Sequence, residues 1–145
     1  MPYALLVTLH LFAAIAFAGT VFFEVIILER AHRHADRQSM RNAERAIGMQ
    51  ARRVMPWVFA ALYGAGIGLA WHYRSLLAAP LATPFAGLLT LKIILAVSVL
   101  CHFAVAMIWG TRGTLNHRRS KIIHLSVFLH VIAIVILAKS LFHAA

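Results

Sequence analysis

The chain has 145 residues, of which 62% are hydrophobic, and its formal net charge is +10 at pH 7. A water-soluble domain of this size cannot bury so much apolar side chain, so the composition excludes that class. The single cysteine excludes an internal disulfide and a thiol-rich metal cage. Four apolar segments follow one another, at residues 3–28, 54–71, 85–109 and 122–142. Each approaches or exceeds the roughly 20 residues that a helix needs to span a bilayer core of about 30 Å.

These four segments define the expected fold. Backbone polar groups find no water in a bilayer, so each segment must satisfy them internally as a helix. The sequence therefore predicts an all-α integral membrane four-helix bundle that forms a single domain over residues 1–145. The second helix carries Ala60, Gly64 and Gly68 at four-residue spacing, which is typical of close helix packing and is the basis for expecting a homodimer.

The positive charge is distributed unevenly over the connections between these helices. The first connection carries Arg30, Arg33, Arg37, Arg41, Arg45, Arg52 and Arg53, the third carries Arg112, Arg118, Arg119 and Lys121, and the second carries Arg74. Basic connections face the cytoplasm, so both termini are expected on the periplasmic side of a bacterial inner membrane. Anionic lipid headgroups explain this charge, and no nucleic-acid partner is expected.

Two ionisable residues lie inside apolar segments, where a charge costs about 2.5–3.5 kcal/mol on insertion scales. His10 lies about seven residues from the outer end of the first helix, or roughly 10 Å deep at 1.5 Å per residue. Lys92 lies at a similar depth in the third helix, which crosses in the same direction. We therefore expect His10 and Lys92 to face each other and to hold a cofactor.

A second polar layer is expected in the inner half of the bundle. His102 and His130 lie at matching depths on the third and fourth helices, roughly 10–12 Å from the inner boundary. Glu24 lies on the same face of the first helix as His10. Ionisable groups inside membrane bundles commonly form proton relays, so this layer could carry protons or bind the cofactor itself.

The residue types favour haem as the cofactor. Histidines on facing helices ligate haem iron in membrane bundles, and a buried lysine can offer a neutral amine to iron or pair with a propionate. Either layer could bind iron, so one or two haem b groups are expected. Copper is the alternative to haem. The candidate soft ligands for it are Cys101, His102 and Met107.

The chain resembles two related groups of four-helix membrane proteins. The resemblance rests on His10, Ala18-Gly19, Leu91-Lys92, His102 at the end of an apolar run, and Ile134-Val135-Ile136-Leu137. One group is the bacterial HemJ-type protoporphyrinogen IX oxidase, and the other is the CopD-type domain associated with copper resistance. The chain departs from the HemJ-type pattern at Phe23-Glu24, where that family has Pro-Arg.

The HemJ-type resemblance implies a haem b membrane oxidoreductase with His10 and Lys92 as axial ligands. It also implies a porphyrin substrate, protoporphyrinogen IX, and transfer of electrons to a membrane quinone. Because ionisable chains inside bundles commonly serve as proton relays, we expect electrons or protons to pass toward the inner half through His102, His130 and Glu24, with Glu24 and His130 as the catalytic residues. The CopD-type resemblance implies copper or metal transport without redox chemistry. In that alternative we expect the metal to bind His102 and His130, with Cys101 or Met107 as a further ligand. A third option is a subunit of a larger membrane complex.

Overall fold

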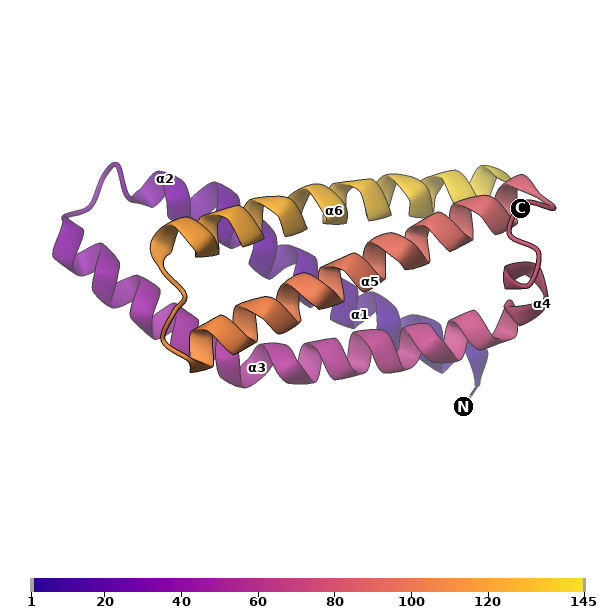
Figure 1. Ribbon diagram of the computed structural model, residues 1–145, viewed down its shortest axis with the longest axis horizontal. Coiled ribbons are helices and arrows are strands. Elements are labelled where there is room, and N and C mark those ends of the chain that lie inside the picture. The colour runs from indigo at the N-terminus through magenta and orange to yellow at the C-terminus, as the bar shows by residue number, and fades with distance from the viewer. Residues whose placement is uncertain (1, 145) are drawn as a thin grey trace. The chain divides into compact units, whose positions relative to one another are not determined.

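The computed structural model describes residues 2–144. In chain order the elements are α1 (Tyr3–Phe22), the π-helical segment η1 (Phe23–Leu28), α2 (Glu29–Ala31), α3 (Arg37–His72), α4 (Arg74–Leu77), α5 (Pro84–Thr111) and α6 (His117–Ala144), as Figure 1 shows. The chain forms two compact units, Met1–His72 and Tyr73–Ala145.

Four helical stretches are long and apolar enough to cross a membrane: Tyr3–Ala31, Arg37–His72, Pro84–Thr111 and His117–His143. All the elements described within residues 2–144 are helical. The prediction of an all-helical chain is therefore confirmed, and the four stretches fit a multi-pass membrane protein. Each stretch is longer than its apolar segment, and the largest difference is at the start of α3.

In the first unit, α1 and α3 lie against each other as an antiparallel pair (Figure 1). At one end of the pair the Tyr3 ring meets His72 edge-on, with 5.3 Å between ring centroids. Further along, Phe17 meets Phe59 edge-on at 4.9 Å. Residues early in α1 thus meet residues late in α3, and the register stays constant along the pair. This register decides which α3 residues surround His10.

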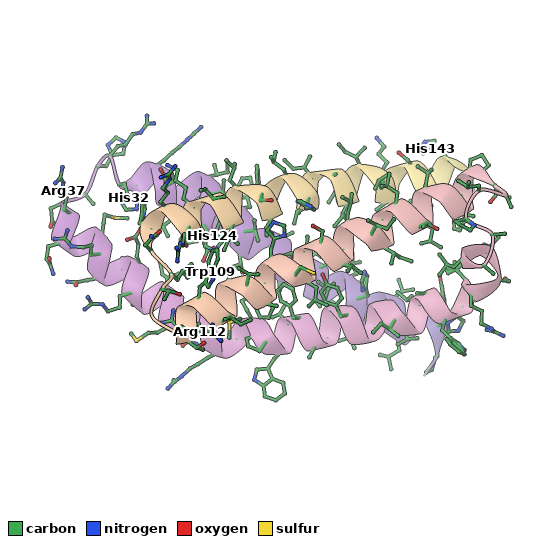
Figure 2. The ribbon with its side chains drawn as sticks, viewed as in Figure 1. His32, Arg37, Trp109, Arg112, His124 and His143 are labelled. Atoms are coloured by element: carbon green, nitrogen blue, oxygen red, sulfur yellow. The ribbon has the colours of Figure 1, made fainter. Side chains whose placement is uncertain are left out.

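The first helical stretch changes its winding near its end. The segment η1 is π-helical and carries Glu24 in its first turn. Single π-helical turns are rare, and they occur frequently at functional sites. The stretch continues through α2, and beyond it the His32 Nε2 lies 2.8 Å from the Glu44 Oε1 on α3. This contact ties the start of the turn, where Figure 2 labels His32, to a residue about two turns inside α3.

The second helical stretch begins well before its apolar part. The Asp36 carboxylate accepts hydrogen bonds from the backbone N–H groups of Gln38, at 2.9 Å, and Ser39, at 3.0 Å, which caps the start of α3. From Arg37 to His72 the helix has 36 residues, or about 54 Å at 1.5 Å per residue. A bilayer core is about 30 Å thick. The arginine-rich first half of α3 therefore lies beyond the apolar part of the same helix.

The cap on α3 predicts a pH-dependent first turn. Hydrogen bonds from Ser39 hold the pKa of Asp36 below its ordinary value of 3.8. Stabilisation by the ionised carboxylate should therefore be complete above pH 3.8 and should be lost as the pH falls through the lower pKa of the folded state. Amide hydrogen exchange of residues 37–40 measures this effect. We expect Asp36→Ala to weaken protection at neutral pH, and Asp36→Asn, which still caps, to remove the acid transition.

The second unit begins with a well-defined start of α5. The Thr83 side chain accepts a hydrogen bond from the Ala86 N–H at 3.1 Å, and Pro84 occupies the first helical position. Proline suits this position because its missing N–H would have no partner inside the helix. These two residues fix where the apolar run of α5 begins and so set the position of Lys92 along it.

The turn between α5 and α6 is held by side chains at its two ends. Gly113 has a φ of +66°, a left-handed conformation that favours glycine. The Asn116 side chain accepts the Arg119 N–H at 2.9 Å and so caps α6. The Arg119 guanidinium lies 4.9 Å from the centroid of the Trp109 ring and donates to the Thr114 carbonyl at 3.0 Å. Figure 2 marks Trp109 at this end of α5.

Candidate functional site

His10 lies on α1 and is bonded to the backbone of α3. Its Nδ1 is 2.9 Å from the carbonyl oxygen of Leu62. A carbonyl oxygen can only accept, so Nδ1 carries the ring proton and the lone pair belongs to Nε2. The ring is half-buried and lies against Gly66, one turn further along α3. Metal-ligating histidines almost always donate their second ring N–H to such a partner.

Lys92 lies on α5, in the second unit, and is half-buried. It follows Leu91, about two turns inside an apolar helix whose start is fixed by Thr83 and Pro84. His10 belongs to the first unit. The pairing of His10 with Lys92 therefore stays a prediction.

The structure brings His102 and His130 together, with their ring centroids 5.3 Å apart. The two rings are held by a reciprocal set of hydrogen bonds. His102 Nδ1 lies 2.7 Å from the Ser98 carbonyl of its own helix, and its Nε2 lies 3.0 Å from the Ser126 hydroxyl of α6. His130 Nδ1 lies 2.8 Å from the Ser126 carbonyl, and its Nε2 lies 3.0 Å from the Ser98 hydroxyl of α5. We call Ser98, His102, Ser126 and His130 the serine–histidine cluster.

The directions of these bonds decide what the cluster can bind. Each Nδ1 donates to a carbonyl, so each Nε2 accepts from a serine hydroxyl. The two nitrogens of an imidazole point to nearly opposite sides of the ring, so His102 directs its Nε2 toward α6 and His130 directs its Nε2 toward α5. The two lone pairs are therefore directed at hydroxyls on opposite helices. A metal ion that took both lone pairs would have to displace both hydroxyl hydrogen bonds.

The one cysteine expected beside this pair lies at the surface of the unit. Cys101 is exposed, although it is adjacent to His102 in sequence. Within residues 2–144, no group of three or more histidine, cysteine or acidic side chains is arranged to hold a metal ion. The cluster therefore fits a polar contact between α5 and α6 better than a chelating site.

Glu24 is half-buried in η1, on the first unit. Its predicted role is to carry protons together with His130, which belongs to the second unit. That role stays a prediction. The π-helical winding is the structural feature that sets Glu24 apart from other polar residues of the same stretch, because an extra residue in a turn changes the face on which the following side chains lie.

The structure adds residues that the sequence interpretation missed. Ser98 and Ser126 each precede a histidine by four residues, and the pattern Ser-x-x-x-His occurs in both helices, once in α5 and twice in α6, where Ser120 and His124 also show it. This repeated spacing was a signal that could have predicted the cluster. The Leu62 carbonyl was not predictable in this way, because a backbone acceptor has no sequence signature.

The small residues of α3 do not share the same surroundings, although their spacing placed them on one expected face. A methyl group added at Gly68 would lie 3.1 Å from a Leu6 side-chain carbon, so Gly68 allows close packing against α1. A methyl group at Gly64 would meet nothing within 4 Å, and Gly64 is exposed. The expected dimer face combined Gly64 with Gly68. In the structure Gly68 packs against Leu6 of α1, whereas Gly64 is exposed. The homodimer stays a prediction.

Comparisons with known proteins leave the chain to be interpreted from its own geometry. No family model matches it, and no curated protein or solved structure matches it. The resemblance to the HemJ-type and CopD-type groups therefore rests on the residues named for it. The geometry separates the candidate ligands into a histidine oriented by a carbonyl of the neighbouring helix, His10, and a pair, His102 and His130, in which each Nδ1 bonds a carbonyl of its own helix and each Nε2 bonds a serine hydroxyl of the other helix.

Proposed function

We propose that the protein binds haem b in a bacterial inner membrane, with His10 and Lys92 as the axial ligands. Both termini would lie on the periplasmic side, because the arginine-rich connections favour the cytoplasm. The observation that carries the proposal is the bond from His10 Nδ1 to the Leu62 carbonyl, at 2.9 Å. This bond fixes the tautomer in which Nε2 carries the lone pair that iron requires.

The surroundings of His10 fit such a ligand. The ring lies between two apolar helices and against Gly66, where a methyl group would come within 3.2 Å of it. A carbonyl partner orients the imidazole without bringing a second charge into the membrane. Lys92 would supply a second ligand as a neutral amine, which requires an apolar setting of the kind that α5 provides.

Bound haem would supply one-electron transfer, and the chain's own residues would manage position and protons. The resemblance to HemJ-type proteins supports a porphyrinogen as the electron donor and a membrane quinone as the acceptor. Glu24 is the candidate proton carrier, since its carboxyl lies in the π-helical segment η1. The reciprocal hydrogen bonds of the serine–histidine cluster favour a structural role for His130.

Haem and copper content of the purified protein tests this proposal. The full chain is expressed with haem and copper both supplied, purified in detergent, and assayed for each per chain. We expect haem b at near-stoichiometric amounts, with copper at background. Copper without porphyrin would overturn the proposal in favour of metal transport. The absence of both haem and copper would also overturn it and would favour the third option, a subunit of a larger complex.

A further inference from the structure

The ring of His10 lies against α3 at a position that has no side chain. A methyl group at Gly66 would lie 3.2 Å from His10 Cε1 and 3.3 Å from its Nδ1. These separations are tighter than ordinary van der Waals contacts, so the ring would have to move by a few tenths of an ångström. The ring atoms nearest to Gly66 therefore include the one that bonds Leu62.

The position of Gly66 relative to Leu62 explains this geometry. In an α-helix the carbonyl of one residue accepts the N–H of the residue four places later, so the Leu62 carbonyl points toward Gly66. A carbonyl oxygen has a second lone pair, and His10 Nδ1 uses it. A side chain at position 66 would stand beside that lone pair. Glycine leaves the approach open.

We propose that Gly66 is a positioning residue, which holds His10 in the tautomer and orientation that the iron ligand needs. The assignment rests on the proposed haem function and deepens it, because it names how α3 controls the ligand carried by α1. The Leu62 carbonyl oxygen accepts the hydrogen bond, and the absence of a side chain at Gly66 leaves space for the His10 ring. The α1–α3 pair thus contains both the hydrogen-bond acceptor of this imidazole and the open position beside it.

Two other glycines on α3 provide matched controls. A methyl group at Gly64 meets nothing within 4 Å, so Gly64→Ala changes the helix without touching α1. A methyl group at Gly68 would come within 3.1 Å of Leu6, so Gly68→Ala crowds the same helix pair without touching His10. The comparison of Gly66→Ala with Gly68→Ala separates an effect on the ligand from an effect on packing.

The experiment combines two readouts on the full chain. Nitrogen-15 NMR of histidine-labelled protein, prepared without haem, reports the His10 tautomer, with His10→Ala used to assign the signal. Haem dissociation from the loaded protein reports the strength of the ligand. Changes to groups that orient a metal ligand typically weaken binding by about 10- to 100-fold. We expect Gly66→Ala to disturb the Nδ1–H signal and to speed haem loss by about that factor, while both controls stay within about threefold of wild type.

The two proposals fail in different ways. A wild-type protein that shows the Nδ1–H tautomer but binds no haem overturns the haem function, and the role of Gly66 toward haem falls with it. A wild-type protein that binds haem, with Gly66→Ala behaving like Gly64→Ala or like Gly68→Ala in both readouts, overturns the role of Gly66 alone.

Discussion

Replacing His10 with alanine is expected to remove haem from the purified protein. The variant deletes the proposed ligand itself, so its effect should exceed the roughly 10- to 100-fold loss that follows from disturbing a ligand's hydrogen-bond partner. We expect haem per chain to fall below about one-tenth of the wild-type value, with loss of the haem b bands from the reduced-minus-oxidised spectrum. The helices should remain, because the ring contacts of Tyr3 and Phe17 with α3 do not involve His10.

His72→Ala is the matched control for this variant. His72 also donates its Nδ1–H to a backbone carbonyl, that of Gly68 at 2.8 Å, but the acceptor lies on its own helix and the side chain is exposed. We expect His72→Ala to retain haem. Equal haem content in wild type and His10→Ala would contradict the assignment and would transfer the ligand role to another histidine.

The second large effect is expected in the serine–histidine cluster. Ser98→Ala and Ser126→Ala each remove the hydroxyl that donates to a histidine Nε2 on the opposite helix. Hydrogen bonds between membrane helices contribute about 0.6 kcal/mol on average and up to about 1.7 kcal/mol. The double variant should therefore lower the free energy of unfolding by about 1–3 kcal/mol, measured by denaturation in mixed micelles.

A double-mutant cycle shows whether the loss comes from these bonds. Ser126→Ala and His102→Ala should be coupled by about 0.6–1.7 kcal/mol, because their side chains bond each other. Thr90→Ala is the control, since the Thr90 hydroxyl donates to the Ala86 carbonyl of its own helix at 2.8 Å. Additive effects of Ser126→Ala and His102→Ala would contradict the reciprocal bonding seen between α5 and α6.

Hydropathy predicted the four long helices but not all their limits. The second helix was expected at residues 54–71, and α3 begins at Arg37. Arginines lower the hydropathy of a segment without reducing its helix propensity, so the apolar stretch marks only the part that suits lipid. The Asp36 cap shows where such a helix starts, because it depends on side-chain hydrogen bonds rather than on hydrophobicity.

Residues of the candidate site were predictable to different degrees. His10 and Lys92 stood out because an ionisable side chain in an apolar segment is costly. Matching depths predicted that His102 and His130 would meet, and their rings lie 5.3 Å apart. Depth alone could not give the orientation of the rings. That orientation follows from two serine hydroxyls and two backbone carbonyls, which hold the two rings in a hydrogen-bonded contact, and ligation of a metal by this pair stays a prediction.

The glycines of α3 illustrate the same limit of sequence patterns. Four-residue spacing placed Gly64 and Gly68 on one expected face, yet the residue that meets His10 is Gly66. A turn of α-helix has 3.6 residues, so spacing alone does not say which of several small residues lies toward a neighbour. The register of α1 against α3 decides it, and that register depends on ring contacts such as Phe17 with Phe59.

The identity of the axial ligands is the most direct test of the haem proposal. Near-infrared magnetic circular dichroism of the oxidised wild-type protein distinguishes the ligand pairs of low-spin haem iron. The account predicts the signature of one imidazole and one amine, from His10 and Lys92. A signature of two imidazoles, as ligation by His102 and His130 would give, or a preparation without haem, would contradict it.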